Sequence, residues 1–261
     1  MAAGAVSVKN TSNDGRGCNI FDGADDSVNT VHCPELLGAN LLNGFTISAW
    51  INPKSAGETN GYIFSKATGG NGQGGFFFAL ASSARFFLRL NGGDIKTSAS
   101  LAITYGKWQH VLATVSSAQL INYYIDGVQS GIVNQDLGKP ISEITTNIIQ
   151  TIGNRSNGTD RSFDGGIKDI KVWNKVLDST EIIKNASETN TADKQIIYFP
   201  LGGNYVNKGS VEVTATNSGS VVGIMDGEIG TALKGQRVTA NDKFLIYKGA
   251  GGQVGSIAIE E

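Results

Sequence analysis

The chain has 261 residues and a formal net charge of −2, and 35 of its residues are glycine. This charge gives no electrostatic basis for binding nucleic acid. No segment reaches the roughly 20 consecutive apolar residues that a membrane-spanning helix requires. Apolar residues occur instead in short runs separated by glycine- and asparagine-rich turns, which favours an all-β domain.

Predicted strands follow one another along most of the chain. Between residues 44 and 52, Phe45, Ile47, Ala49 and Ile51 recur with a period of two, which is typical of a strand with one buried face. Pro53 lacks a backbone donor and is expected to end that strand. Strands are predicted near residues 5–8, 18–21, 27–31, 44–52, 61–66, 75–81, 85–91, 108–116, 120–126, 147–153 and 166–174.

The buried faces of these strands define an expected core between two antiparallel sheets. It is expected to contain Phe45, Ile47, Ile51, Val111, Ile125, Ile167 and Ile170.

One helix is predicted, over about residues 179–185. Asp178 can cap its first backbone amides, and Glu181 stands at the third helical position, where its side chain can reciprocate. Ile182 and Ile183 are expected to supply the apolar side of a lid over one end of the sandwich.

Several motifs in a fixed order carry a resemblance to a known family. The chain is similar to the laminin-G-like, concanavalin A-like jelly rolls, which implies a jelly-roll β-sandwich with a short helix and a β-rich C-terminal extension. The motifs are FDGADDSV at residues 21–28, GFTISAWINP at 44–53, GKWQHVLATV at 106–115, INYYIDGV at 121–128 and FDGGIKDIKVWN at 163–174. The Asp-Gly pair at residues 126–127 predicts a tight hairpin turn.

The C-terminal part resembles the segment that normally precedes the first of these motifs. We therefore expect residues 1–195 to form the sandwich and residues 196–261 to complete it or to contact a neighbouring subunit, because a missing strand leaves an open sheet edge. A second, truncated domain is the remaining alternative, although so short a segment buries little apolar surface. Phe199, Leu201, Ile229 and Leu233 are the side chains expected to be buried.

Catalysis is not expected, and no catalytic residues are assigned. Glycoside hydrolysis usually needs two carboxylates, and glucanases of this superfamily carry them on one strand as Glu-x-Asp-x-x-Glu. The corresponding segment here, residues 167–171, reads Ile-Lys-Asp-Ile-Lys, so Asp169 is its single acid. His32 and His110 are the only histidines, too few for a multi-histidine zinc site.

No cofactor is expected, and calcium is the alternative. Many relatives hold a calcium ion with carboxylates, and the resemblance makes Asp22, Asp25 and Asp169 the metal candidates, with Asp26 next to them. Lys168 stands where family members commonly have a second acid, and its ammonium offsets part of the attraction for a cation.

The two cysteines, Cys18 and Cys33, bracket the first predicted hairpin. A diagonal disulfide across that hairpin is one interpretation. A reduced pair is the other and the favoured one, because no secretory leader precedes the sequence.

Carbohydrate recognition in this fold combines aromatic side chains with adaptable polar loops. Trp50 and Trp173 are expected to pack in the protein interior. The glycine- and asparagine-rich loops near residues 69–75 and 154–161 suit hydrogen bonding to a ligand. The candidate ligand-binding residues are Tyr62, Asn71, Asn154, Asn157 and Asp160.

The expected function is that of a non-catalytic structural or surface protein of a virus or phage particle, in a capsid decoration or a tail fibre, where such sandwiches often serve assembly or attachment to host glycans. The start of the chain does not read as a secretory signal, and particles released by lysis need none. The expected partners are other virion proteins, copies of the chain itself and cell-surface glycans, at the virion surface, without nucleic acid or membrane insertion. A secreted bacterial carbohydrate-binding module or adhesin is the alternative, and a glycoside hydrolase a distant third.

Overall fold

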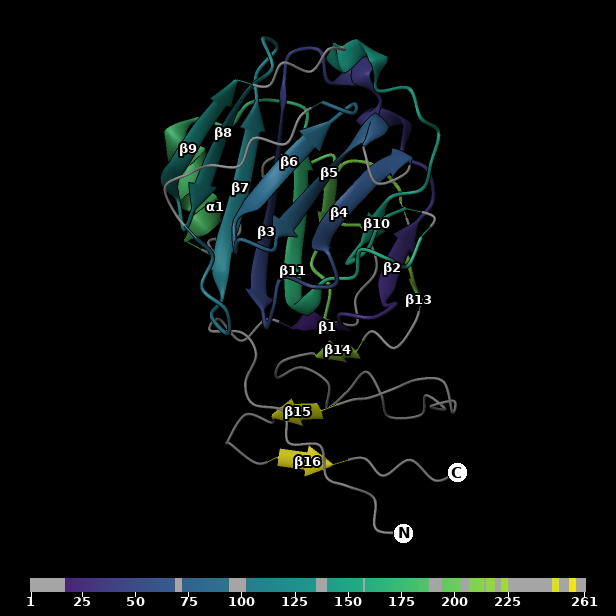
Figure 1. The fold of residues 1–261 in the computed structure, drawn as a ribbon, viewed down its shortest axis with the longest axis vertical. Coiled ribbons are helices and arrows are strands. Elements are labelled where there is room, and N and C mark those ends of the chain that lie inside the picture. The colour runs from purple at the N-terminus through teal and green to yellow at the C-terminus, as the bar shows by residue number, and fades with distance from the viewer. Residues whose placement is uncertain are drawn as a thin grey trace.

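A computed structural model of the chain describes residues 17–68, 72–93, 102–134, 140–156, 158–187, 194–202, 207–213, 215–218, 222–224, 246–248 and 254–256. Within these residues, two antiparallel sheets enclose one large hydrophobic core (Figure 1). The all-β sandwich predicted from the sequence is therefore confirmed. The strand predicted at residues 5–8 and the side chains of Ile229 and Leu233 lie outside the described residues.

The larger sheet has eight strands in the order β14-β1-β11-β3-β7-β8-β9, and β12 also pairs with β11. Its strands are β1 (Cys18–Asp22), β3 (Phe45–Pro53), β7 (Gln109–Val115), β8 (Leu120–Ile125), β9 (Val128–Asn134), β11 (Asp164–Trp173), β12 (Ile197–Phe199) and β14 (Val222–Ile224).

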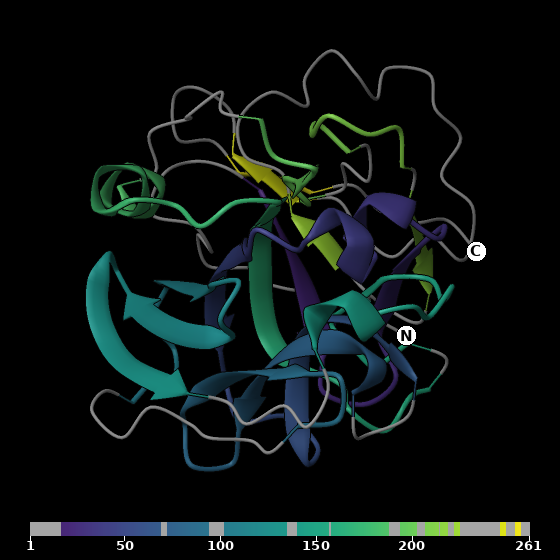
Figure 2. The same cartoon turned by 90° about the horizontal axis from the view of Figure 1, so that it is seen from above.

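The smaller sheet has six strands in the order β13-β2-β10-β4-β5-β6. They are β2 (Ser27–Thr30), β4 (Asn60–Thr68), β5 (Gln73–Ala81), β6 (Phe86–Leu90), β10 (Thr151–Ile152) and β13 (Ala215–Ser218). A separate pair is formed by β15 (Ile246–Lys248) and β16 (Val254–Ser256). Three short 3-10 helices, η1 (Pro34–Leu36), η2 (Gly38–Asn40) and η3 (Ile141–Glu143), gather at one end of the sandwich (Figures 1 and 2).

The core follows the period-two pattern of the sequence. All of the predicted core residues are at most 6% exposed and belong to the main cluster between the sheets. The Asp-Gly turn between β8 and β9 also has the expected conformation. Asp126 has a φ of 51° and Gly127 a φ of 78°, so both residues are in the left-handed region. Glycine adopts this conformation without a steric penalty.

Strands from the C-terminal segment lie in both sheets. β12 and β1 both run antiparallel to β11, where Phe199 pairs with Ile170 and Asn19 pairs with Ile167. They therefore occupy one strand position end to end. β14 extends the larger sheet beyond β1, and β13 extends the smaller sheet beyond β2. Of the side chains expected to be buried in this segment, Phe199 is 0% exposed and Leu201 is 3% exposed.

The helix α1 (Ser179–Ala186) has the predicted capping box. The backbone N of Glu181 donates to Oδ1 of Asp178 at 2.9 Å, and the backbone N of Asp178 donates to Oε2 of Glu181 at 3.0 Å. Two details of the helix prediction were wrong: the burial of Ile183, and the position of the helix over one end of the sandwich. Ile183 is 59% exposed, because successive helical residues lie about 100° apart and only Ile182 turns inward.

The helix covers the outer face of the larger sheet rather than an end of the sandwich. Ile182 packs against Leu112 of β7 and Trp173 of β11, both of which point away from the main core. In Figure 2 α1 accordingly lies to the side of the strands. Among the described residues, no helix combines the length and apolar character needed to cross a membrane.

Both cysteines are buried and no disulfide joins them, so the disulfide interpretation was wrong. Cys18 packs against Trp50 and Trp108 on the outer face of the larger sheet, whereas Cys33 lies in the main core. Burial raises the pKa of the Cys33 thiol to about 12, and the nearby Glu35 acts in the same direction.

Candidate functional site

Several predicted ligand-binding residues meet around the loop that joins β10 to β11, residues 153–163. Asn154 lies at its base and is fully buried. Its Oδ1 accepts hydrogen bonds from the backbone N of Arg155 at 2.9 Å and of Arg161 at 3.2 Å. Its Nδ2 donates to the backbone O of Asp26 at 3.3 Å. Because its amide is engaged within the protein, Asn154 shapes the loop rather than presenting itself to a ligand.

Further bonds hold the loop against the smaller sheet. The Ser156 hydroxyl lies 3.1 Å from the backbone O of Ser65 on β4, and the backbone N of Tyr62 donates to the backbone O of Arg161 at 2.9 Å. At the start of the loop, Gly153 has a φ of 81°, and a Cβ there would lie 2.0 Å from the Phe21 ring. The described residues of the loop are therefore anchored at its start, at Ser156 and at Arg161.

The exposed part of the loop presents a cluster of charged side chains. Nε of Arg155 lies 2.5 Å from Oδ1 of Asp160, and Nη1 of Arg161 lies 3.6 Å from Oδ2 of the same carboxylate. These side chains are 28%, 47% and 24% exposed for Arg155, Asp160 and Arg161 respectively. Arg89 on β6 pairs in register with Phe77 on the neighbouring β5. We call Arg89, Arg155 and Arg161 the arginine cluster.

An aromatic layer underlies the arginine cluster. The Tyr62 ring stacks on Phe77 with centroids 4.3 Å apart, and Phe87 meets Phe77 edge-on at 5.7 Å. All three side chains are at most 1% exposed, so Tyr62 offers no open platform for a sugar ring. Burial raises the pKa of Tyr62, although the charges of the arginine cluster act in the opposite direction. Two of these arginines are also tied to the aromatic layer through the backbone, because the backbone N of Tyr62 donates to the backbone O of Arg161 and Arg89 pairs in register with Phe77.

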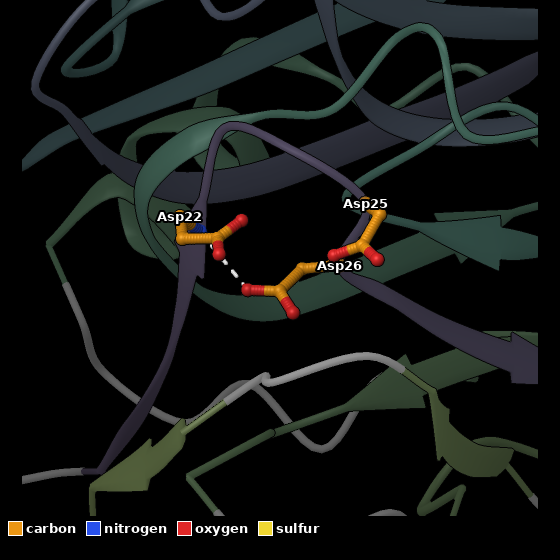
Figure 3. A group of neighbouring side chains, drawn as sticks. All are labelled: Asp22, Asp25 and Asp26. Carbon is orange, nitrogen blue, oxygen red and sulfur yellow. Dashed lines mark hydrogen bonds between the residues drawn. The ribbon is translucent and has the colours of Figure 1, made fainter.

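The turn between β1 and β2 brings three carboxylates together (Figure 3), and the backbone O of its Asp26 accepts the hydrogen bond from Asn154. Oxygens of Asp22, Asp25 and Asp26 lie within 4.8 Å of one another. The backbone N of Asp22 donates to Oδ2 of Asp26 at 2.9 Å (Figure 3). The backbone N of Ala24 donates to Oδ1 of Asp22 at 2.9 Å. Carboxylate oxygens suit calcium chemically. However, the same carboxylates also close the turn through these backbone bonds, so the turn accounts for its own geometry.

Asp169, the third predicted metal ligand, is placed elsewhere. Asp22 pairs with Asp164 on β11, and Asp169 lies five residues further along that strand, a separation of about 15 Å. Its Oδ1 accepts a hydrogen bond from the Tyr198 hydroxyl at 2.9 Å, and its φ of 51° marks the bulge between Lys168 and Lys171. The structure therefore does not bring Asp169 to the acidic turn.

On the outer face of the larger sheet, lysines and aromatic rings lie around Asp169. Nζ of the fully buried Lys168 lies 5.3 Å from the Trp50 ring and 5.1 Å from the Trp108 ring. Nζ of Lys171 donates to Oδ1 of Asn185 on α1 at 2.8 Å. Trp50 is 9% exposed and Trp173 is 1% exposed, in agreement with the predicted packing role. This face of β11 is thus occupied by the protein's own side chains.

His110 is also part of the packed outer face. It is 1% exposed and lies beside Trp50, with ring centroids 5.4 Å apart. Burial lowers its pKa to about 3, and the charge of Lys171 adds to this shift. The imidazole is therefore neutral near pH 7, as expected for a packed strand residue.

Asn71 and Asn157 lie outside the described residues. The arginine cluster was not predicted from the sequence. The signal available was the segment RSNGTDR at residues 155–161, in which two arginines flank an asparagine-glycine pair. Nothing in that segment indicated that it folds back onto β4.

Comparisons with known proteins agree with this architecture. The structure is similar to that of a heptameric SAP-like pentraxin from Limulus polyphemus, with a TM-score of 0.54 and 19% identity over 78% of this chain and 96% of that chain. It is also similar to a putative carbohydrate binding protein from Bacteroides ovatus, with a TM-score of 0.57 and 16% identity over 79% of this chain and 59% of that one. At these identities the likeness concerns the fold alone. A search of curated proteins finds no match.

A family model described as the concanavalin A-like lectin/glucanases superfamily matches residues 22–183. Apart from Phe21, this segment includes every motif that carried the resemblance in the sequence, and it covers more than half of the chain. The chain belongs to the concanavalin A-like lectin/glucanases superfamily.

Proposed function

We propose that this protein is a non-catalytic, lectin-like binding protein and that the β10–β11 loop with the arginine cluster is its carbohydrate-binding surface. The observation that carries the proposal is the construction of the loop. Its base is fixed by buried hydrogen bonds of Asn154, while Arg155, Asp160 and Arg161 remain partly exposed on top. Polar groups held rigidly at a surface suit the recognition of hydroxyl-rich ligands, because little entropy is lost when they bind.

The absence of catalysis is supported by the acids of β11. A glycosidase places its two carboxylates roughly 5 to 9.5 Å apart on either side of the scissile bond. Asp164 and Asp169, the two acids of β11, are about 15 Å apart along the strand. Asp169 is also only 2% exposed. These two carboxylates are therefore poorly placed to act together on a saccharide.

We further propose that the protein works at the surface of a virus or phage particle, in contact with other virion proteins or copies of itself. The supporting feature is that short strands from the C-terminal segment, β14 and β13, each form one edge of a sheet among the described residues. Sheet edges are ready sites for pairing with another chain. A secreted bacterial carbohydrate-binding module is the second candidate, favoured by the likeness to the Bacteroides ovatus protein, which is described as a putative carbohydrate binding protein.

A glycan array probed with the purified full-length chain tests the binding function. We expect signal on a restricted set of glycans and loss of that signal in Arg155→Ala, with Lys184→Ala on α1 as the control for removal of one positive charge. A folded protein that binds no glycan contradicts the proposal. Release of reducing ends from a polysaccharide panel that Asp169→Asn abolishes contradicts the non-catalytic assignment.

The state of assembly of the chain distinguishes a virion component from a secreted carbohydrate-binding module. Co-sedimentation of the chain with purified particles, together with self-association in isolation, is expected for a virion component. A strictly monomeric chain that is absent from particles favours the secreted module.

A further inference from the structure

We propose that Arg155 and Arg161 form a subsite for the carboxylate of an acidic saccharide, and that Asp160 occupies this subsite when no ligand is bound. The inference rests on the proposed carbohydrate-binding function and specifies its ligand class. The ligand is a sugar that carries a carboxylate, such as a uronic or a sialic acid.

The first argument is the balance of charge at the loop surface. Two guanidinium groups share the single carboxylate of Asp160, at 2.5 and 3.6 Å. The chain as a whole carries a net charge of −2. Because the positive charge of these guanidinium groups is concentrated at the loop of a protein with negative net charge, anionic groups are attracted to the loop and not to the surface in general.

The second argument is the quality of the contacts with Asp160. Although Nε of Arg155 and Oδ1 of Asp160 are close, the two atoms do not meet hydrogen-bond geometry. Asp160 comes from the same loop as both arginines, so its backbone limits how its carboxylate can align with them. A ligand carboxylate has no such restriction and can approach a guanidinium through two parallel hydrogen bonds, the arrangement that arginine favours.

The third argument is access. The Asp160 side chain is 47% exposed, while those of Arg155 and Arg161 are 28% and 24% exposed. Asp160 is thus the most exposed of the three side chains, although its Oδ1 and Nε of Arg155, the two atoms in closest contact, are themselves buried. Rotation of the Asp160 side chain toward solvent opens the arginines without any change in the buried loop base.

The fourth argument is the support beneath the arginines. The backbone N–H groups of Arg155 and Arg161 are both fixed on Oδ1 of Asn154. Arg89 on β6 pairs in register with Phe77, which stacks on Tyr62, and its positive charge lowers the pKa of Tyr62. The subsite is therefore held by buried groups, and ligand binding does not have to order it.

The test measures binding of the full-length chain to acidic oligosaccharides and to the same oligosaccharides with their carboxyl groups reduced to alcohols. One arm uses sialyllactose, a second uses a glucuronic acid oligosaccharide, and a third uses a sulfated oligosaccharide without carboxylates. We expect at least one carboxylated ligand to bind about tenfold tighter than its reduced form, since charge-assisted bonds of this kind are the strong ones. Binding that is unaffected by carboxyl reduction, or restricted to the sulfated ligand, overturns the inference.

Variants separate a binding role from a structural one. Arg155→Ala and Arg161→Ala are expected to abolish the preference for the acidic form, and Lys184→Ala to preserve it. Asp160→Asn removes the internal competitor from an exposed position, so it is expected to fold normally and to bind the acidic ligand several-fold tighter. Unchanged or weaker binding by Asp160→Asn contradicts the inference, even where the arginine variants fail to fold.

The inference and the proposed function fail separately. Glycan binding without any preference for the carboxylate refutes the subsite and leaves the lectin-like function standing. Absence of all glycan binding by a folded chain refutes both.

Discussion

Replacing Asn154 by alanine removes three hydrogen bonds at the base of the β10–β11 loop. The backbone N–H groups of Arg155 and Arg161 and the backbone carbonyl of Asp26 lose their partner, and Asn154 itself is 0% exposed. A typical bond contributes about 1 kcal/mol net, and a buried group left unpaired costs about 1 to 3 kcal/mol. We therefore expect Asn154→Ala to lower the free energy of unfolding by about 3 kcal/mol. For a domain of this size, that corresponds to a fall in the thermal midpoint of about 6 to 12 °C.

Calorimetry and urea unfolding of the full-length chain measure this change. Asn122→Ala is the matched control, because Asn122 lies partly exposed on β8 and donates a single long bond, 3.5 Å, to Thr114. Its effect is expected to stay below about 1 kcal/mol. A thermal midpoint of Asn154→Ala within 2 °C of the wild type would refute the reasoning, since it would mean that the other loop contacts suffice.

Further outcomes follow from individual sites. Gly153→Ala is expected to destabilise the fold by about 3 kcal/mol or more, as measured by urea unfolding, because its Cβ meets the Phe21 ring at 2.0 Å. The folded-state pKa of His110 is about 3 against an ordinary 6.5. The unfolded chain therefore binds a proton that the folded chain does not, and His110 makes stability fall by up to about 1.4 kcal/mol per unit as the pH drops from 6.5 to 3. Stability curves that coincide for the wild type and His110→Gln over this window would contradict that assignment. Cys33, with its pKa near 12, is expected to react with iodoacetamide at pH 8 only after denaturation; rapid alkylation of the native chain argues against its burial. Deletion of residues 196–261 removes strands from both sheets and is expected to abolish cooperative unfolding; an equally heat-resistant truncated chain would show these strands to be dispensable.

The elements predicted best from the sequence are those governed by local rules. The alternation of Phe45, Ile47 and Ile51 placed them in the core because side chains of a strand point to opposite faces in turn. The capping box of α1 followed from the spacing of Asp178 and Glu181 alone. Both rules depend on neighbours within a few residues, so no knowledge of the tertiary structure was needed.

The candidate site depended on contacts that local rules do not describe. The facing of Tyr62 was uncertain from sequence because the register of β4 shifts between Tyr62 and Phe64, and a shift of one residue exchanges the two faces. The loop that carries Arg155 and Arg161 returns to β4, where the backbone N of Tyr62 donates to the backbone O of Arg161. Arg89 and Arg161 are far apart in the sequence, and the pattern of residue types along the chain does not indicate which distant residues lie close in space.

The split strand position on β11 connects the C-terminal segment to the candidate site. The first half of β11 pairs with β1, which leads into the acidic turn, and the second half pairs with β12. The two halves meet at Asp169, whose side chain accepts a bond from Tyr198 of β12. Just beyond β12, the backbone N of Gly202 donates to Oδ1 of Asn19 on β1 at 2.9 Å. The C-terminal segment therefore supports both β1 and β11, and these are the strands from which the acidic turn and the arginine-bearing loop extend. A change in that segment is expected to reach the binding surface through these two strands, although it contributes none of the residues assigned to that surface.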